Sequence, residues 1–536
     1  MYSKFSLMAA VISVASLSLT TVHAFDDNAA RSKSVYQVVT DRFALTDPSA
    51  SRTCDTDDKV YCGGTWKGTE EKLDYIHGMG FDTVWISPVV QNINVTNNKL
   101  GEAYHGYWTQ DINEINSHFG SEADLKSLVD TAHKKGMYIM VDVVVNHVAT
   151  TQAGSFTADS TYGPLNVTTR DFHSFCWVQD YTNQTQVEVC WLGDENVALA
   201  DVNTEEASVV STFNTWIKNL VATYGFDAIR IDTVKHVRQN FWPDFVSAAG
   251  VHAVGEVLDG DPAYIAAYQN NSINSVFNYP LYYALDAAFN STSKSLSQVV
   301  TALNSNKQQF KDTTLLGNFI SNHDNPRFES HVADKALIKN AVATIYGVEG
   351  IPYVYYGQEQ GYTGGADPAN REALWLSGYE ESKDMYTYFT TMNTIRSAAN
   401  NASSTYNTNQ ATIIGQDDHN LVIRKDPVIS IVTNRGSKAA TSSMSITNTG
   451  FTSATELTDV ISCTAYTTDS QGAFTASIKS GLPAIFLPTS QKGSLCGNVS
   501  ATTTGSSSTK SAGLRDTASI ALLASLVVPM IAFMTI

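Results

Sequence analysis

The chain is 536 residues long, which is more than one simple core needs and predicts a large domain of roughly 350 residues followed by a smaller one. Its composition is ordinary for a globular protein, and its formal net charge of -18 argues against nucleic acid and against electrostatic docking on anionic lipid. For an exported protein such acidity is more typical of solubility than of binding.

The first 24 residues have the pattern of a secretory signal peptide. Lys4 precedes an apolar run, and a small-residue exit ends at Ala24, so we expect cleavage before Phe25. A buried N-terminal helix is the alternative.

From about Val35 to Tyr356, strand-like runs alternate with helix-like runs, which indicates parallel βα units. The strand-like runs are 35–39, 83–87, 137–145, 227–231, 252–257, 274–277, 314–320 and 351–356. Eight such units predict an α/β fold, a (β/α)8 TIM barrel.

Two of the connecting helices can be predicted in detail. Ser121 and Asp124 have the spacing of an N-terminal cap, and the helix should end at Gly136. Its apolar stripe consists of Leu125, Leu128, Val129 and Ala132. A second helix is expected from Glu205 to Tyr224, and we interpret its apolar face as core.

Two segments depart from the βα pattern. Residues 148–203 form a long polar insertion after the third strand, which predicts a small subdomain above the active face of a barrel made of 25–147 and 204–405. Residues 406–497 contain short alternating strands without helices, which predicts a C-terminal antiparallel β-sandwich.

The six cysteines suggest three disulfides in a secreted chain. Fifteen pairings are possible, and local grouping favours Cys54 with Cys62, Cys176 with Cys190, and Cys463 with Cys496. A zinc site is the alternative, but the cysteines lack zinc-ligand spacing. Seven sequons fit an exported glycoprotein: Asn94, Asn166, Asn183, Asn270, Asn290, Asn401 and Asn498.

The C-terminal end predicts a GPI anchor. A Ser/Thr-rich region at 498–517 precedes an apolar tail at 518–536, which is the order that a GPI signal requires. A transmembrane anchor is the alternative, but Pro529 and the missing charged flank favour GPI, with cleavage expected among 505–508. We therefore expect the protein at the cell surface, on the plasma membrane or in the wall.

Three of the strand-like runs deliver a carboxylate, at Asp232, Glu256 and Asp324. Because the carboxyl ends of barrel strands meet at one rim, these acids should converge on one site. In FDAIRID the strand period places Arg230 beside Asp232, where its charge should keep the carboxylate ionised. Small and apolar neighbours should raise the pKa of Glu256 towards the range that suits a general acid.

Taken singly, each of these residues has a structural interpretation, as a buried Arg–Asp pair, a strand end or a turn. Jointly the three acids indicate cleavage of a glycosidic bond, since two carboxylates can break the bond and a third can stabilise the oxocarbenium-like transition state.

Four segments carry a resemblance to a known family. VDVVVNH, FDAIRIDTVKH, VGEVLDGDP and NHDNPRF resemble the signature regions of the α-amylase family of glycoside hydrolases, and the secreted fungal members are the most alike. The resemblance extends from about Val35 to Cys496. It implies a retaining mechanism with Asp232 as nucleophile, Glu256 as acid and then base, and Asp324 as transition-state stabiliser.

The resemblance also implies contacts with an α-glucan. The matching positions are Tyr107, Trp108, His147, Arg230, Lys235, His236, His323, Asp367 and Arg371. Such residues suit a glucan, because aromatic rings stack on sugar faces and charged side chains hydrogen-bond hydroxyl groups. Without the resemblance, Trp108 would be assigned to the core.

A structural Ca²⁺ between barrel and subdomain is implied in the same way. Its matching ligands are Asn146, Glu188, Asp201 and the backbone carbonyl of His236. All are oxygen donors, the type that calcium prefers. Without the resemblance, Glu188 and Asp201 would be ordinary surface acids.

Two departures from the fungal pattern bear on specificity. The cysteines of a fourth disulfide are absent, and Leu100 stands where an aromatic residue is usual, which should weaken sugar stacking. We expect an active monomeric endo-hydrolase of α-1,4-glucosidic bonds in starch-like or glycogen-like glucan. A transglycosylase acting on cell-wall α-glucan is the closest alternative, and a non-catalytic glucan-binding wall protein is a third hypothesis.

Overall fold

The computed structural model describes residues 25–47, 49, 52–95, 99–156 and 162–497. The predicted signal peptide, the Ser/Thr-rich region, the apolar tail and the sequon at Asn498 lie outside these described residues. Within the described part of the chain, no helix is long and apolar enough to cross a membrane.

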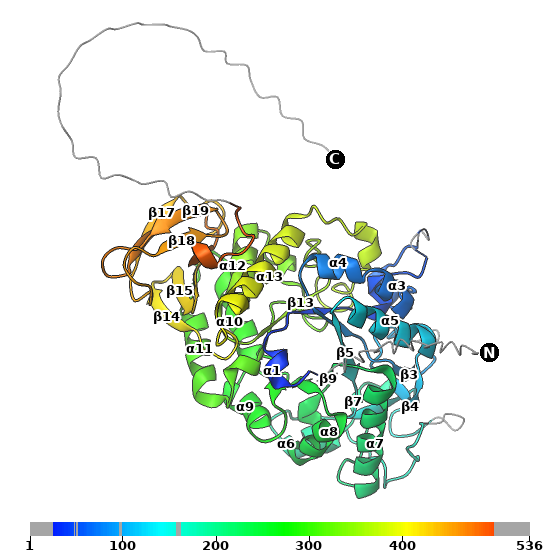
Figure 1. Cartoon of the computed structure of the whole chain (residues 1–536). Helices are drawn as coiled ribbons and strands as arrows, with labels where there is room; N and C mark the ends of the chain where they lie inside the picture. The colour runs from blue at the N-terminus through cyan, green and yellow to red at the C-terminus, as the bar shows by residue number, and fades with distance from the viewer. Residues whose placement is uncertain (1–24, 48, 50–51, 96–98, 157–161, 498–536) are drawn as a thin grey trace, which may run out of the picture.

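Eight parallel strands form a barrel at the centre of the molecule (Figure 1). They are β1 (Val35–Gln37), β2 (Thr83–Ile86), β5 (Tyr138–Val143), β9 (Ala228–Ile231), β10 (His252–Gly255), β11 (Ser275–Val276), β12 (Gly317–Asn318) and β13 (Ile351–Tyr355). Their order is β11-β10-β9-β5-β2-β1-β13-β12, and a parallel bridge between Phe277 and Gly317 joins the two ends. Each predicted run contains one strand, so the barrel prediction is confirmed.

The seventh strand is shorter than predicted. The run 314–320 contains only the two residues of β12, because its beginning belongs to a 3-10 helix, Thr313–Leu315. Asp312 causes this turn, since its Oδ1 accepts hydrogen bonds from the backbone nitrogen of Thr314 at 2.9 Å and from Oγ1 of Thr314 at 2.5 Å. A local side-chain bond thus competes with the extended conformation that the apolar residues favour.

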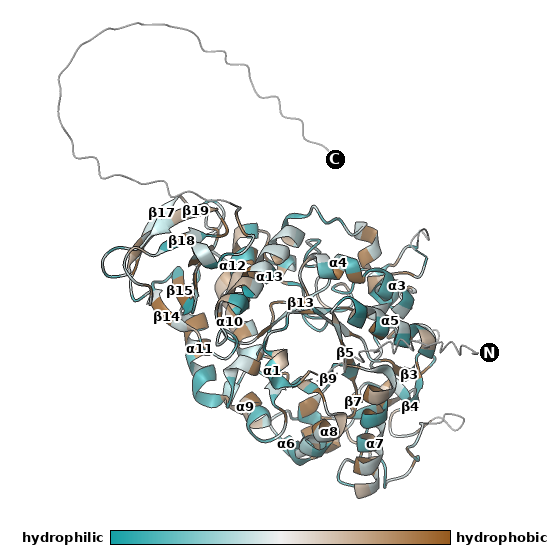
Figure 2. Ribbon diagram, in the orientation of Figure 1, coloured by the Kyte–Doolittle hydropathy of each residue, from teal (hydrophilic) through white to brown (hydrophobic). Residues whose placement is uncertain are grey.

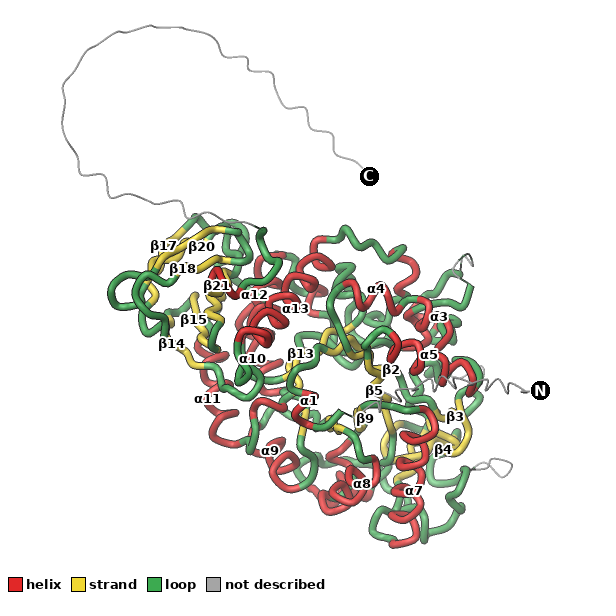
Figure 3. The backbone as a smooth tube through the Cα atoms, viewed as in Figure 1, coloured by secondary structure: helices red, strands yellow, loops and turns green. Residues whose placement is uncertain are grey.

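Helices surround the barrel (Figure 3). They include α3 (Trp66–Glu71), α4 (Leu73–Gly78), α5 (Glu122–Lys134), α7 (Ala207–Tyr224), α8 (Trp242–Ala249), α9 (Pro262–Asn271), α10 (Tyr279–Phe289), α11 (Ser297–Gln309), α12 (Lys335–Gly347) and α13 (Asp384–Ala402). Two short helices, α1 (Asp27–Ala30) and α2 (Thr40–Phe43), flank β1.

The two helices predicted in detail are present. At α5, Oγ of Ser121 accepts from the backbone nitrogen of Asp124, whose carboxylate accepts in return from the backbone nitrogen of Ser121. The predicted apolar stripe of this helix is buried. Along α7, hydrophilic and hydrophobic residues alternate in colour, as a helix with one buried face requires (Figure 2).

Two segments inserted between barrel elements form small sheets of their own. The insertion after β5 contains β6 (His147–Thr150), α6 (Gln184–Val189), β7 (Leu192–Gly193) and β8 (Ala198–Asp201), with the strands in one antiparallel sheet. A second inserted segment, which was not predicted, is the antiparallel pair β3 (Val90–Asn92) and β4 (Thr109–Ile115) between β2 and α5.

The C-terminal domain consists of two antiparallel sheets (Figure 1, upper left). The larger contains β14 (Thr412–Gln416), β15 (Asn420–Lys425), β16 (Val428–Thr433), β21 (Ala484–Pro488), β18 (Glu456–Asp459) and β19 (Thr464–Thr467). The smaller pairs β17 (Ser442–Ile446) with β20 (Phe474–Ile478). The domain joins the barrel at α12, where Oδ1 of Asn340 accepts from the backbone nitrogen of Thr433 at 2.7 Å.

Three disulfides join the cysteines in the pairs that local grouping favoured. They are Cys54–Cys62, Cys176–Cys190 and Cys463–Cys496. The second lies in the inserted subdomain and the third closes the C-terminal domain. Of the sequons in the described residues, Asn94, Asn166, Asn183, Asn270 and Asn401 are exposed and Asn290 is half-buried.

The closure of the barrel yields a first prediction. A Cβ atom on Gly317 would come within 2.9 Å of a ring carbon of Phe277 and 3.0 Å of one of Tyr353. Gly317→Ala should therefore destabilise the barrel by about 1–3 kcal/mol, measured by thermal unfolding. Gly365→Ala is the matched control, because a Cβ there would meet no atom within 4 Å. Equal melting temperatures for the two variants would contradict this account of closure.

Candidate active site

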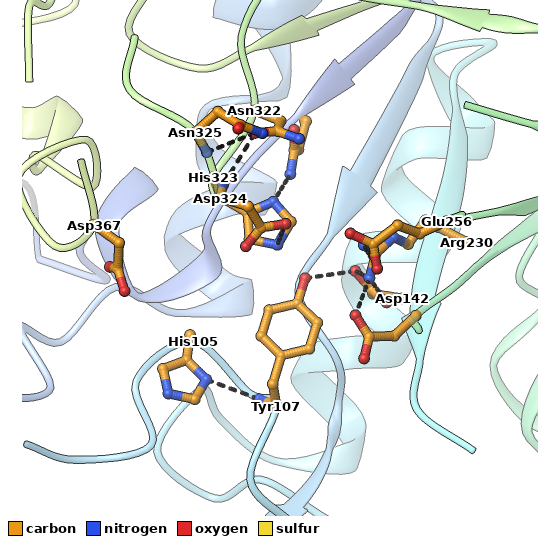
Figure 4. Close-up of polar contacts among 12 residues, drawn as sticks. His105, Tyr107, Asp142, Arg230, Glu256, Asn322, His323, Asp324, Asn325 and Asp367 are labelled. Carbon is orange, nitrogen blue, oxygen red and sulfur yellow. Dashed lines mark hydrogen bonds and ion pairs between the residues drawn. The ribbon is translucent and has the colours of Figure 1, made fainter. Parts of the chain in front are cut away.

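Two of the three predicted carboxyl groups, those of Asp232 and Glu256, contact one arginine, and Figure 4 shows Glu256 beside this Arg230. Arg230 on β9 is buried, and its Nη1 lies 2.8 Å from Oδ1 of Asp232 while its Nη2 lies 3.1 Å from Oε2 of Glu256. Asp324, on the loop after β12, is close enough to influence the pKa of both acids. The sequence prediction that these residues share one rim therefore agrees with the geometry.

Asp142 is a fourth carboxylate of this cluster, which sequence reasoning missed. It lies on β5 within VDVVVNH, and its two oxygens accept from Nη1 of Arg230 at 3.0 and 3.1 Å. Its Oδ2 also accepts from Nε1 of Trp85 at 3.0 Å and from the hydroxyl of Tyr107 at 2.8 Å. A charged residue inside an apolar strand was the available signal.

Burial determines the direction of the pKa shifts in this cluster. It raises the pKa of Asp232; the Arg230 charge lowers it and the Asp324 charge raises it further, so the net shift is upward. The sequence had suggested the opposite direction, because it showed the neighbouring cation and could not show the desolvation. Burial also raises the pKa of Asp142, to about 7.

Glu256 has the environment of a general acid. Burial raises its pKa, Arg230 opposes the shift, and the charges of Asp232 and Asp324 add to it. Its Oε2 accepts from the backbone nitrogen of Thr233 at 3.0 Å, so the carboxyl group is oriented as well as buried. The pKa of Glu256 is therefore raised in the direction that proton donation near neutral pH requires.

Asp324 is more accessible than the other two acids. Its side chain is 33% exposed, and its carboxylate lies 3.5 Å from Nε2 of His323 and 3.6 Å from Nη2 of Arg371. Arg371 in turn lies 3.1 Å from Asp367. Asp324 therefore faces the cleft, and its charged neighbours are more distant than Arg230 is from Asp232 and Glu256.

The cleft above the cluster is formed by two adjoining hollows that share Leu192 and Thr233. One, of about 340 Å³, is lined by Tyr107, Trp108, His147, Asp232, His323, Asp324, Asp367 and Arg371. The other, of about 430 Å³, is lined by Tyr181, Lys235, His236, Glu256 and Leu258. The predicted sugar contacts line these hollows, apart from Arg230 below them. Tyr104, His105, Tyr181, Leu192 and Leu258 are lining residues that the sequence did not single out.

The histidines of the cleft are neutral hydrogen-bonding groups. Burial lowers the pKa of His147 and of His236 to about 4, and it lowers that of His323 well below the usual value. The rings of His323 and Tyr107 stack with centroids 5.3 Å apart and planes at 7°. These residues can therefore bind uncharged hydroxyl groups without adding charge to the site.

The predicted calcium ligands can be tested on oxygen positions. The side-chain oxygen of Asn146 lies 3.0 Å from the carbonyl oxygen of His236 and 3.2 Å from Oδ2 of Asp201. Three oxygens that face one another suit a cation, although a turned Asn146 amide would instead donate to the other two. Among the described residues, no group of three or more His, Cys, Asp or Glu side chains is arranged to hold a metal ion, so any such site must also use amide and carbonyl donors.

Glu188, the remaining predicted ligand, lies on α6. Its Oε1 accepts from Nε2 of Gln184 at 2.8 Å. Burial raises the pKa of Asp201, and the charge of Glu188 adds to this shift. The neighbouring Val187 carbonyl binds Nδ1 of His236 at 3.0 Å, which brings α6 against the loop after β9. The donor set is thus gathered where the insertion meets the barrel.

Comparison with known proteins gives consistent matches over nearly all of the described chain. Residues 37–420 match the family model described as "Alpha amylase, catalytic domain", and residues 413–504 match "Alpha-amylase, domain C". The chain is 45% identical over 496 residues to an alpha-amylase of Saccharomycopsis fibuligera, covering 92% of this chain and 99% of that one.

Two further relatives agree. The chain is 47% identical over 465 residues to Alpha-amylase 2 of Schwanniomyces occidentalis, covering 86% of this chain and 90% of that one. The solved structure of an alpha-amylase from Malbranchea cinnamomea superposes with a TM-score of 0.84 at 42% identity, covering 88% of this chain and 99% of that one.

The carboxyl cluster yields a prediction about pH. Arg230→Met leaves buried carboxyl groups without their counter-charge, which should cost about 3–5 kcal/mol of stability at neutral pH. The pKa values of Asp232 and Glu256 would rise further above the unfolded values near 4, so the loss should shrink as pH falls towards about 4 and these groups gain protons.

Thermal unfolding from pH 4 to pH 8 measures this effect. Arg230→Lys is the control, since it keeps the charge without the planar fork and should show a smaller dependence on pH. A stability loss in Arg230→Met that is the same at every pH would contradict the assignment.

Proposed function

The chain belongs to the alpha-amylase family and is a glycoside hydrolase that cleaves α-1,4-glucosidic bonds within glucan chains, and on that basis we propose how its residues divide the reaction. Asp232 is the nucleophile, Glu256 is the acid and then the base, and Asp324 stabilises the transition state. The observation that supports this division is that one guanidinium, that of Arg230, contacts both Asp232 and Glu256. A shared cation keeps the two carboxyl groups near each other, and retaining enzymes use the closer spacing of roughly 5–5.5 Å.

In the first step, Glu256 gives its proton to the glycosidic oxygen while the Asp232 carboxylate attacks the anomeric carbon. The bond to the leaving sugar breaks and an ester to Asp232 forms. In the second step, Glu256 takes a proton from water, the water oxygen attacks the anomeric carbon, and Asp232 leaves as a carboxylate. Asp324 faces the positive charge that develops on the sugar ring in both steps.

The electrostatics explain how Glu256 serves in both steps. The negative charge of Asp232 contributes to the raised pKa of Glu256 in the free enzyme. When Asp232 becomes an ester its charge is lost, so the pKa of Glu256 falls and the group becomes available as a base. The neutral histidines His147, His236 and His323 bind sugar hydroxyls beside these charges.

Calcium is proposed as a structural ion of this enzyme. Asn146, Glu188, Asp201 and the carbonyl of His236 would hold it, and its charge would tie the inserted subdomain to the barrel. Because His236 also lines the cleft, this joint supports the sugar-binding face.

We propose that the protein is located at the cell surface, and the patterns at the two ends of the chain support this location. The expected signal peptide and the apolar tail at 518–536 have the order of an exported, GPI-anchored protein, and the five sequon asparagines that are exposed among the described residues are compatible with glycosylation. We also propose that the enzyme acts as a monomer.

Transglycosylation is the second candidate activity, in which a sugar hydroxyl replaces water in the second step. Tyr181 and Leu258 are exposed in the same hollow as Glu256 and favour it, since the Tyr181 ring can stack on an acceptor sugar and Leu258 adds an apolar contact.

The catalytic assignment predicts a specific kinetic defect. Glu256→Gln should lower kcat on maltooligosaccharides by about 10²–10⁴-fold, because the leaving sugar is no longer protonated. On a maltosyl fluoride, whose leaving group needs no proton, the first step should be restored. Undiminished turnover of maltooligosaccharides by the variant would refute the role of Glu256.

The lengths of the products formed by the native enzyme distinguish the two activities. Hydrolysis predicts products shorter than the substrate, and dominant longer products would show that transfer is the main activity.

Removal of calcium should lower thermal stability. Chelation is expected to reduce the melting temperature of the native enzyme and to have less effect on Asp201→Asn, in which the proposed site is already impaired. Glu205→Gln is the control, because Glu205 contacts His173 at 2.7 Å, as Asp201 does at 2.6 Å, and is not a proposed ligand. A native melting temperature that exhaustive chelation leaves unchanged would contradict the proposed ligand set.

A further inference from the structure

Tyr279 lies directly beside Glu256 and has no part in the mechanism above. It is the first residue of α10, it is 1% exposed, and its hydroxyl oxygen lies 3.4 Å from Oε1 of Glu256. Nδ2 of Asn322 donates to the same hydroxyl oxygen at 3.2 Å. A chain of polar groups therefore runs from Asn322 through Tyr279 to Glu256.

The orientation of Asn322 follows from its other contacts. Its Oδ1 accepts from the backbone nitrogens of Asp324 at 3.1 Å and of Asn325 at 2.9 Å, and from Nδ2 of Asn325 at 3.0 Å. Because backbone nitrogens can only donate, the amide oxygen must face the loop and the amide nitrogen must face Tyr279. Figure 4 shows Asn322 turned towards Asn325 on this loop.

The direction of the next hydrogen bond is then determined. The Tyr279 oxygen already accepts from Asn322, so its single proton is available for Glu256. Burial raises the pKa of Tyr279 well above the usual value, so the hydroxyl stays protonated across the working range of the enzyme.

We propose that Tyr279, oriented by Asn322, is a positioning residue that donates a hydrogen bond to the Glu256 carboxylate and so sets the pH range in which Glu256 can act. The proposal rests on the proposed role of Glu256 as acid and base. A donor to the charged form stabilises the carboxylate that exists after proton delivery and before water activation.

The contacts of Glu256 show why this donor matters. Its Oε2 is held by Arg230 at 3.1 Å and by the backbone of Thr233 at 3.0 Å, whereas Tyr279 approaches the other oxygen. The donor therefore opposes the burial that raises the pKa of this group. It also couples Glu256 to the loop that carries Asp324, since Asn322 donates to the Tyr279 hydroxyl and accepts from the backbone nitrogen of Asp324.

Packing is the competing explanation for Tyr279. Its ring meets that of Phe319 edge-on, with centroids 5.1 Å apart. Tyr282, one turn further along α10, stacks on the same ring with centroids 4.9 Å apart and planes at 12°. The two tyrosines thus share a packing environment, and Tyr279 is the one beside Glu256.

The test is the pH profile of kcat/KM for Tyr279→Phe on maltooligosaccharides. The alkaline limb reports loss of the Glu256 proton, so removal of a donor to the carboxylate should move this limb to higher pH by about 0.5–1 unit. We expect kcat to fall by roughly 10-fold with little change in KM, because the ring and the cleft are kept.

Tyr282→Phe is the matched control and should leave the limb in place, and thermal unfolding of both variants checks that they are folded. A purely structural role predicts a lower melting temperature for Tyr279→Phe with an unmoved limb, and that result, or a shift to lower pH, would overturn the proposal. Glu256→Gln in the same assay separates the two claims. If Glu256→Gln stays active, the proposed function fails, whereas an inactive Glu256→Gln with an unmoved limb in Tyr279→Phe refutes this inference alone.

Discussion

The buried guanidinium of Arg230 is the interaction on which the active site depends. It reaches Asp142, Asp232 and Glu256 from one position on β9. Burying several carboxyl groups together is unfavourable without a counter-charge, and a planar, permanently charged fork can serve all of them at once. The barrel provides the geometry, because its adjacent strands place these side chains at one rim.

The balance of burial and charge around this guanidinium gives each acid a distinct environment. Burial raises the pKa of both Glu256 and Asp324, but Glu256 is the more enclosed of the two, whereas Asp324 faces the cleft between His323 and Arg371. The inserted subdomain contributes to this enclosure, since His147 and Leu192 line the cleft. The same insertion carries Asp201 and Glu188, so the predicted calcium site and the substrate cleft share one structural element.

Local patterns predicted the strands, the two described helices and the residues at strand ends, because period and capping are properties of neighbouring residues. The sequence did not reveal Asp142, Tyr279 or Asn322 as site residues, since their roles arise from contacts across the barrel, such as Tyr279 with Glu256, 23 residues away. The upward shift in the pKa of Asp232 was missed for a related reason. The sequence shows the neighbouring Arg230, but it does not show that the Asp232 carboxyl group is buried. The length of β12 was overestimated, because the hydrogen bonds of Asp312 turn the chain before this strand.

The central claim is that Asp232, held beside Glu256 by Arg230, forms a covalent bond with the sugar. A fluorinated maltosyl fluoride that slows the second step should trap this ester, and proteolysis followed by mass spectrometry would locate it. The account predicts a glycosyl mass increment on the peptide that contains Asp232, and its absence from an Asp232→Asn variant. An increment on Asp324 or Glu256, or an inverted product without a trapped ester, would contradict it.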